Sequence, residues 1–224
     1  MTHRAQERID HDAFRDLRER MVNSQLMSRG IVDQRVLHAM RTIAREVFVP
    51  TEWKASAYDD RALPIGHDQT ISQPYIVAYM TELLRVEPRS RVLEIGTGTG
   101  YQTAVLATLG QHVYTIERIA ALSEVAGLIL RDLAVNNVSL RVGDGTLGWC
   151  EEQPFDRIML TAGGPRVPGT LLDQLADGGI LVAPIGSRHE QHIVRVTRRG
   201  PDFLQTQHLP CRFVKLVGQE GWEE

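Results

Sequence analysis

Apolar residues in the first part of the chain recur every three to four positions, which is the spacing of amphipathic helices. One helix is predicted over residues 13–28, followed by Gly30, which favours a helix end. A second is predicted to begin after Asp33, a residue type that caps helix N-termini, and to end before Pro50. Both helices precede the first predicted strand of the main sheet. Residues 1–57 are therefore expected to form a helical cap.

The periodicity is lost between residues 58 and 74, where turn-forming residues surround isolated apolar ones. Irregular segments of this length are uncommon in compact domains and are usually functional or disordered. The apolar side chains of Leu63, Ile65 and Ile71 argue against disorder. Residues 58–74 are therefore predicted to form a loop that binds the substrate.

From residue 75 onward, short apolar segments alternate with helical ones. Strands are predicted at residues 92–95, 112–116, 138–142, 155–161 and 179–184, and helices at residues 76–84, 102–109, 119–133 and 168–175. Such alternation is typical of a mostly parallel sheet covered by helices on both faces. The predicted fold class is α/β, with a doubly wound, Rossmann-like core over residues 75–190.

The last part of the chain has a different pattern. Two strand-like segments flank Gly200–Pro201, and the second runs toward Val217. Strands joined by a short turn predict an antiparallel hairpin, which closes the sheet over residues 191–218. These segments fit a single domain over residues 1–224, a length that permits a sizeable core.

Residues 92–102 have the sequence Val-Leu-Glu-Ile-Gly-Thr-Gly-Thr-Gly-Tyr-Gln, an apolar strand followed by three alternating glycines. Gly96, Gly98 and Gly100 permit positive φ angles and a close approach of the backbone to a ligand. The helix that follows directs its unpaired N–H groups at the same loop. The pattern predicts a strand, a glycine loop and a helix around a nucleotide-like ligand. An ordinary tight turn is the alternative for the glycines alone.

The spacing of the glycines separates two classes of cofactor. Dinucleotide sites use G-x-G-x-x-G, and the third glycine of that pattern would fall at position 101, where this chain has Tyr101. The observed G-x-G-x-G follows Glu94, an acid that would repel a pyrophosphate and attract a cation. This arrangement is similar to the first motif of class I methyltransferases, whose cofactor S-adenosyl-L-methionine carries positive charge and no phosphate.

Two further acids follow predicted strands, at the edge where α/β sheets bind ligands. Glu117 lies about twenty residues beyond the first glycine, a spacing that suits hydrogen bonds to ribose hydroxyls. Asp144, within Gly143-Asp144-Gly145, is placed to meet an adenine amino group. Residues 160–165, after the fourth predicted strand, offer neither a metal ligand nor an aromatic clamp. No metal is therefore expected.

Composition narrows the expected partners and compartment. The net charge of −3 and the pI near 6.2 lack the basic character of proteins that track a phosphate backbone, so nucleic acid is not an expected partner. Cys150 and Cys211 do not have the spacing of a zinc site. The charged N-terminal residues do not resemble a signal peptide, and no apolar run approaches the ~20 residues of a membrane span. We expect a cytoplasmic protein without a membrane anchor.

Several segments together resemble the protein-L-isoaspartate (D-aspartate) O-methyltransferase family, over about residues 20–218. They are Asp68-Gln69-Thr70-Ile71-Ser72-Gln73-Pro74, residues 92–102, Gly143-Asp144-Gly145, Pro154-Phe155-Asp156-Arg157-Ile158, residues 171–175 and Arg212-Phe213-Val214. The resemblance implies methyl transfer from S-adenosyl-L-methionine, leaving S-adenosyl-L-homocysteine, to the free carboxylate of L-isoaspartyl and D-aspartyl residues in damaged proteins and peptides. It also implies that the resulting ester starts repair through a succinimide.

The resemblance assigns roles to individual residues. Ser72 matches the active-site serine and would hold the acceptor carboxylate, with Thr70, Ile71 and Val214 bordering the substrate. The residues expected to hold the cofactor are Glu94, Gly96, Thr97, Gly98, Gly100, Glu117, Asp144 and Gly145. Because a carboxylate with a pKa near 4 is ionised at neutral pH, the reaction needs neither a general base nor a metal. We expect the enzyme to be a monomer.

Two departures from the family pattern concern the peptide groove. Lys215 stands where proline is usual after Phe-Val, and Ala162-Gly163-Gly164 follows Thr161 where Ala-Ala is common. Two alternatives stay open: a methyltransferase of the same fold acting on a carboxylate of a ribosomally made peptide, and a non-catalytic, cofactor-binding adaptor. Adaptors that resemble this family usually carry a long C-terminal extension, and because the sequence ends within a few residues of Val217 we expect an enzyme instead. Paired peptides with isoaspartate or aspartate would separate these alternatives.

Overall fold

The computed structural model describes residues 13–223. Residues 13–21 are α-helical, and the helix continues through the wider turn η1 (Val22–Leu26) and the tighter turn η2 (Met27–Arg29). Gly30 ends it in the left-handed region at φ 91°, as predicted. The second predicted helix is α2 (Gln34–Thr42), and the Asp33 side chain accepts the Arg35 N–H at its start.

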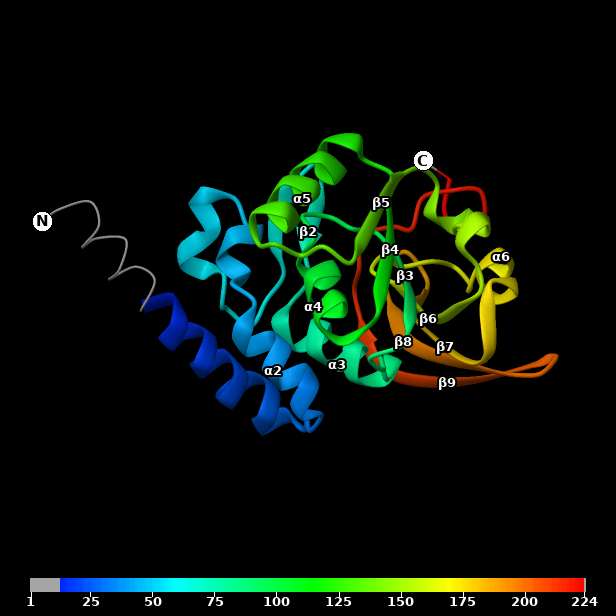
Figure 1. Cartoon of the computed structure of the whole chain (residues 1–224), viewed down its shortest axis with the longest axis horizontal. Helices are drawn as coiled ribbons and strands as arrows, with labels where there is room; N and C mark the ends of the chain where they lie inside the picture. The colour runs from blue at the N-terminus through cyan, green and yellow to red at the C-terminus, as the bar shows by residue number, and fades with distance from the viewer. Residues whose placement is uncertain (1–12, 224) are drawn as a thin grey trace, which may run out of the picture.

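The remainder of the N-terminal part, before residue 58, forms two 3₁₀ turns in place of a longer helix. They are η3 (Arg45–Phe48) and η4 (Thr51–Ser56). The N-terminal segments lie at one end of the molecule, in blue and cyan in Figure 1. Thr99 Oγ1 donates a 2.7 Å hydrogen bond to the carbonyl of Phe48, which ties η3 to the predicted glycine loop.

The prediction of an irregular loop is wrong for residues 63–71, which form a β-hairpin. Strand β1 (Leu63–Gly66) pairs with β2 (Gln69–Ile71) in antiparallel register. The turn consists of His67 and Asp68, both at positive φ, which matches the twist of a two-residue hairpin. Alternation of buried and exposed side chains within four residues of β1 is too short a pattern to stand out in the sequence.

The confirmed fold class is α/β, with seven strands in the order β5-β4-β3-β6-β7-β8-β9. The strands are β3 (Arg91–Ile95), β4 (His112–Glu117), β5 (Val138–Val142), β6 (Phe155–Leu160), β7 (Leu175–Gly186), β8 (Gln191–Arg199) and β9 (Asp202–Cys211). Strands β3 to β7 are parallel, and β8 and β9 are antiparallel additions at one edge. The strand order reverses between β3 and β6, where sheets of this kind bind ligands.

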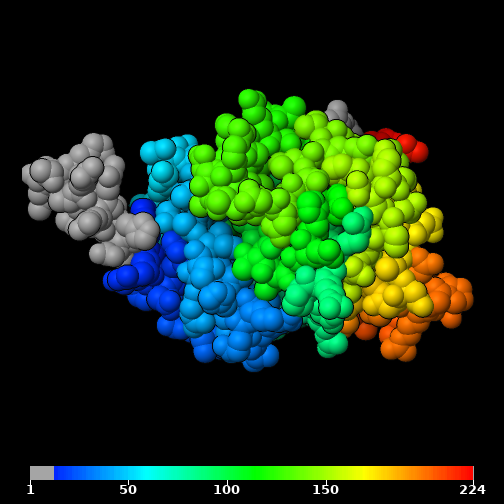
Figure 2. All heavy atoms as spheres, viewed as in Figure 1, coloured from blue at the N-terminus to red at the C-terminus, as the bar shows by residue number. Residues whose placement is uncertain are grey.

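The two faces of the sheet are covered unequally. The helices are α3 (Pro74–Leu84), α4 (Tyr101–Leu109), α5 (Ala120–Asp132) and α6 (Gly169–Asp173). The larger apolar cluster joins α3, α4 and α5 to one face and extends into α2, whereas the smaller cluster packs α6 against the other face. In Figure 2, α5 and β5 (green) cover the middle of the visible surface, with the N-terminal segments at one end.

The hairpin at the end of the chain is shorter than predicted. Strand β9 ends at Cys211, and residues 212–217 leave the sheet edge and cross toward the end of β6. There the Val214 carbonyl accepts the Gly163 N–H, and the Leu216 N–H donates to the Gly163 carbonyl. The strand-like pattern up to Val217 therefore reflects a segment buried in part, and not a continuation of the ladder.

Candidate functional site

Three adjoining hollows follow the carboxyl ends of β3, β4 and β6. The inner pocket is lined by Gln69, Ile95, Gly96, Ile116, Glu117, Arg118, Gly145, Ala162, Lys215, Leu216 and Val217. The central pocket is lined by residues 96–99, Tyr101 and Gln102, by Ile65, Thr70, Ile71 and Ser72, and by Ile76, Val77, Met80, Thr161 and Phe213. The outer groove is lined by Ala62, Thr70, Ser72, Gln73, Ile76, Thr161 and residues 210–214. Shared lining residues make the three hollows neighbours.

The glycine loop has the geometry that its spacing predicts. Gly96, Gly98 and Gly100 all have positive φ, at 99°, 56° and 96°. A Cβ at Gly96 would lie 2.3 Å from Thr161 Oγ1, the hydroxyl that donates to the Gly96 carbonyl at 2.6 Å. Only glycine combines this backbone angle with that contact. The loop is thus fixed against the end of β6, with its backbone exposed to both the inner and the central pocket.

Glu94 supports the loop from beneath and does not line any of the three hollows. Its side chain is fully buried, and its Oε2 accepts the hydroxyls of Thr103 at 2.5 Å and Thr115 at 2.7 Å. Burial raises the pKa of Glu94 to about 8, partly offset by these hydrogen bonds. The expected attraction between a Glu94 carboxylate and a cationic cofactor is therefore not visible in this arrangement.

Thr97 extends the same buried network to the pocket. Its hydroxyl lies 2.6 Å from that of Thr115, and Thr97 lines the central pocket. Oε1 of Glu94 is buried without a hydrogen-bond partner among the described residues. Because Glu94 lines none of the three hollows, this oxygen does not face a ligand bound in them.

Glu117 is the acid that the structure places in the inner pocket. Its Oε2 accepts the Gly98 N–H at 2.9 Å, and its Oε1 accepts the Ile119 N–H at 3.0 Å. Each carboxylate oxygen has capacity for a further hydrogen bond. Glu117 thereby fixes the glycine loop to the start of α5 and can still accept hydroxyl donors from a ligand.

Asp144 does not line the inner pocket, although Gly145 does. Oδ1 of Asp144 caps the short turn η5 (Gly145–Leu147) by accepting the Thr146 N–H and hydroxyl. Its Oδ2 accepts the Gln219 N–H at 2.7 Å. In this structure Asp144 anchors the C-terminal segment, and its predicted contact with an adenine amino group stays a prediction. Gly145 lies where the prediction needs it, in the lining of the inner pocket, and a Cβ there would lie 2.4 Å from Ile95.

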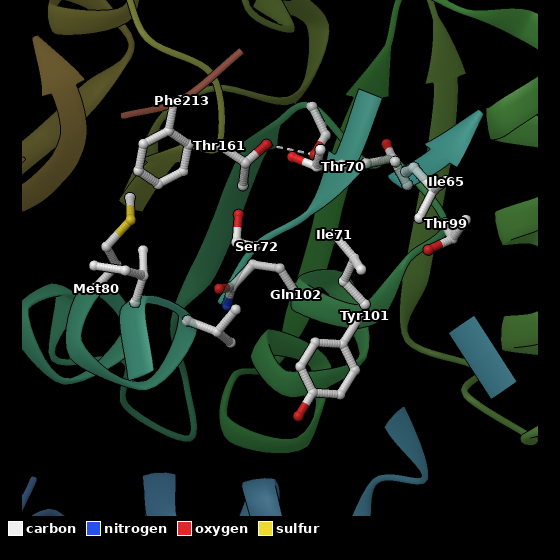
Figure 3. Close-up of a pocket in the computed structure, with 15 residues that line it drawn as sticks. Ile65, Thr70, Ile71, Ser72, Met80, Thr99, Tyr101, Gln102, Thr161 and Phe213 are labelled. Carbon is white, nitrogen blue, oxygen red and sulfur yellow. Dashed lines mark hydrogen bonds between the residues drawn. The ribbon is translucent and has the colours of Figure 1, made fainter. Parts of the chain in front are cut away.

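Ser72 lines both the central pocket and the outer groove, together with Thr70. Figure 3 shows the Ser72 hydroxyl directed into the pocket, and no described residue hydrogen-bonds to it. Ile71 is almost fully buried and packs beneath this position. Val214 borders the outer groove. The structure thus brings together the acceptor residues that the sequence comparison assigned, although Val214 does not belong to a strand.

Two residues at the junction of the pockets were missed as site residues. Thr161 follows β6 and lines both the central pocket and the outer groove. Its position beside β3 at the reversal of strand order would have identified it. Phe213 lines the same two hollows and lies beside Met80 in Figure 3. It supplies the aromatic wall that residues 160–165 lack, and only the fold could bring it there.

The two departures from the family pattern meet at one contact. The bridge between Gly163 and Lys215 uses the carbonyl of Val214 and the N–H of Leu216. The N–H of Lys215 takes no part in it, so proline at that position would lose no ladder hydrogen bond. A Cβ at Gly163 would lie 3.1 Å from Gln191, so an added methyl group would press on a buried side chain.

Two kinds of reactive group were sought among the described residues: a cluster of metal ligands and a reactive thiol. Within residues 13–223, His, Cys, Asp and Glu side chains nowhere form a group of three that could hold a metal ion. Cys211 lines the outer groove, but burial raises the pKa of its thiol to about 11, so it stays protonated at neutral pH. In the same part of the chain, no helix is long and apolar enough to cross a bilayer.

The family model and the most similar curated relatives that match this chain point to the same family. Residues 17–221 match the family model described as protein-L-isoaspartate(D-aspartate) O-methyltransferase. A protein-L-isoaspartate O-methyltransferase of Geobacter metallireducens is 52% identical over 206 residues, covering 92% of this chain and 95% of that protein.

Two solved structures agree with the sequence comparison. One, named protein-L-isoaspartate O-methyltransferase, has a TM-score of 0.83 and 31% identity, covering 91% of this chain and 67% of that chain. The other is a Plasmodium falciparum protein assigned to the same activity, in complex with S-adenosyl-L-homocysteine. It has a TM-score of 0.76 and 26% identity, covering 91% of this chain and 98% of that chain.

Proposed function

The chain belongs to the protein-L-isoaspartate(D-aspartate) O-methyltransferase family, and from this premise we propose how its own residues carry out the reaction. The protein transfers a methyl group from S-adenosyl-L-methionine to the free carboxylate of L-isoaspartyl residues, and of D-aspartyl residues, in damaged proteins and peptides. The ester that results begins repair through a succinimide. We assign the glycine loop to the methyl donor, and residues 69–73 with residues 210–214 to the acceptor peptide.

The residues of the inner and central pockets fit the proposed cofactor. Gly96 and Gly145 both line the inner pocket, and Glu117 beside them keeps acceptor capacity for ribose hydroxyls. When bound, S-adenosyl-L-methionine supplies an electrophilic methyl group on a positively charged sulfur. Its relative, S-adenosyl-L-homocysteine, is the group present in the Plasmodium falciparum structure.

The chain's task on the acceptor side is to hold an anion that is already reactive. A free carboxylate is ionised at neutral pH, so no residue has to remove a proton from it. In our proposal the Ser72 hydroxyl donates a hydrogen bond that fixes one carboxylate oxygen, while Thr70 and Val214 border the peptide. Phe213 and Ile76 exclude water from the junction. Orientation of this kind can lower the activation free energy by at most roughly 7–11 kcal/mol.

One observation carries this assignment: Ser72 lines the pocket of the glycine loop and the open groove beyond it. A carboxylate held there could reach the methyl donor from one side while its peptide lies outside. The outer groove is lined by the end of β9, by residues 212–214 and by the residues around Ser72, so we assign it to the peptide that carries the carboxylate.

The activity is tested with labelled S-adenosyl-L-methionine and two peptides that differ only in isoaspartate or aspartate at one position. Label is expected on the isoaspartyl peptide alone. Equal labelling of both peptides, or labelling of neither, contradicts the proposal. The first outcome would favour a different carboxyl methyltransferase, and the second, with cofactor still bound, a non-catalytic adaptor.

The role of Ser72 is tested by Ser72→Ala. Loss of one positioning hydrogen bond is expected to lower kcat about 10²-fold while the Kd for S-adenosyl-L-homocysteine stays within about twofold. A wild-type kcat with intact cofactor binding would remove Ser72 from the mechanism. We also propose that the enzyme acts as a monomer, and light scattering during gel filtration checks this against the 25.2 kDa of the chain.

A further inference from the structure

Arg45 in η3 is fully buried, yet no described residue forms an ion pair with it. Its neighbour Glu46 is engaged elsewhere, because it pairs with Arg18 at 3.2 Å and accepts the hydroxyl of Tyr58. Burial lowers the pKa of the Arg45 guanidinium. A buried cation without a counterion is costly, and hydrogen bonds to neutral groups repay only part of that cost. Packing alone does not account for an arginine at this position.

The contacts of Arg45 connect the cap to both sides of the candidate site. Its Nε donates to the Ala57 carbonyl and its Nη2 to the Ser72 carbonyl, each at 2.7 Å. Its guanidinium carbon lies 4.7 Å from the ring centre of Tyr101, the first residue of α4 after the glycine loop. Nη1 is buried without a hydrogen-bond partner among the described residues. Arg45 thus touches the acceptor segment and the base of the cofactor loop together.

The bond to Ser72 is made where regular structure gives that residue no support. Pairing of β2 with β1 ends at Ile71, and α3 begins at Pro74. The carbonyl of Ser72 therefore lies between a strand and a helix, and Arg45 provides its hydrogen bond. A backbone fixed at the carbonyl restricts where the side chain of the same residue can point.

We propose that Arg45 is a positioning residue for the methyl transfer, acting through the backbone of Ser72 and the ring of Tyr101. This inference rests on the proposed function. In that reaction a carboxylate oxygen forms a bond to the methyl carbon, the carbon–sulfur bond breaks, and its electron pair stays on the sulfur. No proton moves, and the negative and positive charges of the reactants both disappear.

This charge loss gives a reason for Arg45 to act through Ser72 and not to contact the reacting carboxylate directly. A guanidinium bonded directly to the reacting oxygen would stabilise the negative charge that the reaction removes, which favours the ground state over the transition state. Arg45 bonds instead to a neutral carbonyl and leaves the carboxylate to the neutral Ser72 hydroxyl. It draws the acceptor segment into place without opposing the reaction.

The experiment compares Arg45→Met, Arg45→Lys and Arg18→Met in the full chain. Arg18 is the matched control, because it also joins segments of the N-terminal part of the chain, but its side chain bonds Tyr58 and Glu46, which do not line the site. For each protein we measure kcat and KM with the isoaspartyl peptide and the Kd of S-adenosyl-L-homocysteine. Hydrogen exchange of residues 69–76 and the melting temperature complete the set.

Arg45→Met is expected to lower kcat about 100-fold, since misplacement of a reacting group by about 1 Å has effects of this size. Its Kd for S-adenosyl-L-homocysteine should change less than fivefold, and exchange at residues 69–76 should become faster. Arg45→Lys keeps the charge and can bond only one carbonyl well, so its kcat should fall about tenfold. Arg18→Met should lower the melting temperature with kcat and exchange at residues 69–76 unchanged.

The inference is overturned if Arg45→Lys keeps wild-type kcat and exchange, or if Arg18→Met loses kcat as strongly as Arg45→Met. Hydrogen exchange separates this failure from failure of the proposed function. If wild-type protein methylates neither peptide while exchange near Ser72 depends on Arg45 as expected, the function is wrong and the positioning of Ser72 by Arg45 still stands. If wild-type protein methylates the isoaspartyl peptide but exchange near Ser72 is unchanged in both Arg45 variants, the proposed function stands and the role of Arg45 is wrong.

Discussion

The two halves of the proposed site are built in different ways. The donor half, defined as residues 96–100 with Glu117 and Gly145, lies on the ends of parallel strands in the middle of the sheet. The acceptor half, defined as residues 62–73 and 210–214, consists of a two-stranded hairpin and a segment that has just left the sheet edge. The donor half is supported from below by Glu94 and its threonine partners.

The acceptor half depends on single hydrogen bonds from buried side chains. Arg45 holds the Ser72 carbonyl, and Oε1 of Gln191 accepts the Phe213 N–H at 2.9 Å. Both supporting side chains are nearly inaccessible, with exposed fractions of 0% and 2%. A protein that uses one methyl donor and many damaged peptides can thus keep one half fixed by its ladder and adjust the other half through a few contacts.

The largest expected difference between the halves is the effect of replacing a glycine by alanine on cofactor affinity. Gly96→Ala forces a Cβ to 2.3 Å from Thr161 Oγ1, so affinity for S-adenosyl-L-homocysteine should fall more than 100-fold. Gly66→Ala in the acceptor hairpin is the control, because its φ of 89° is similar and a Cβ there meets nothing within 4 Å. The control should lose only about 1–2 kcal/mol of stability. Calorimetric titration and thermal melts measure both, and equal cofactor affinities in the two variants would contradict the comparison.

The buried carboxyl of the donor half should make stability depend on pH. Because burial raises the pKa of Glu94 to about 8, the folded cofactor-free protein keeps a proton that the unfolded chain releases near pH 4.5. This contribution to stability is complete below pH 4.5 and is lost as the pH rises through about 8. The loss is at most roughly 3–5 kcal/mol.

Glu94→Gln removes this titration while keeping an oxygen that can accept the Thr103 and Thr115 hydroxyls. Between pH 5 and pH 8 wild type should lose stability that the variant keeps. The free energy of unfolding of Glu94→Gln minus that of wild type should therefore grow as the pH rises. Glu124→Gln, an exposed position on α5, controls for the substitution itself. Urea melts across this pH range give the difference, and parallel curves for wild type and Glu94→Gln would show that the carboxyl does not titrate there.

A smaller effect is expected at the outer wall of the acceptor half. Gln191→Leu leaves the Phe213 N–H without its acceptor, which should cost about 1–3 kcal/mol of stability and raise KM for the isoaspartyl peptide about tenfold. Gln174→Leu is the matched control, since this glutamine is 1% exposed and binds the Trp149 N–H away from the groove. It should cost similar stability with KM unchanged. A similar rise in KM in both variants would mean that the groove responds to a general loss of stability and not to the position of Phe213.

The smallest effect is expected where the cap meets the donor half. Thr99→Val removes the hydrogen bond to the Phe48 carbonyl at a buried position and should cost about 1–2 kcal/mol of stability. Because strand ends fix the loop independently, affinity for S-adenosyl-L-homocysteine should change less than threefold. Thr108→Val, whose hydroxyl binds the Ala104 carbonyl within α4, provides the comparison. A tenfold loss of affinity at position 99 would show that the cap, and not the sheet, sets the shape of the loop.

Local patterns determined most of the fold. The alternation of strands and helices predicted all five parallel strands and the order of elements, because each element depends on its own residues and on the period of its apolar face. The hairpin at residues 63–71 was missed, since its strands are short and only the positive φ angles of its turn identify it. The end of β9 was misplaced because a buried irregular segment carries the same apolar pattern as a strand.

The sequence by itself determined the fold class and the family, through the alternation of strands and helices, three glycines at fixed spacing and the motif around Ser72. The tertiary structure decided which side chains support and border the site. Thr161, Phe213 and Arg45 come from segments far apart in the chain, and Asp144 is directed at residues 218–219. Backbone conformation follows from neighbours in sequence, whereas the partners of a buried polar group depend on which segments packing brings within hydrogen-bond distance.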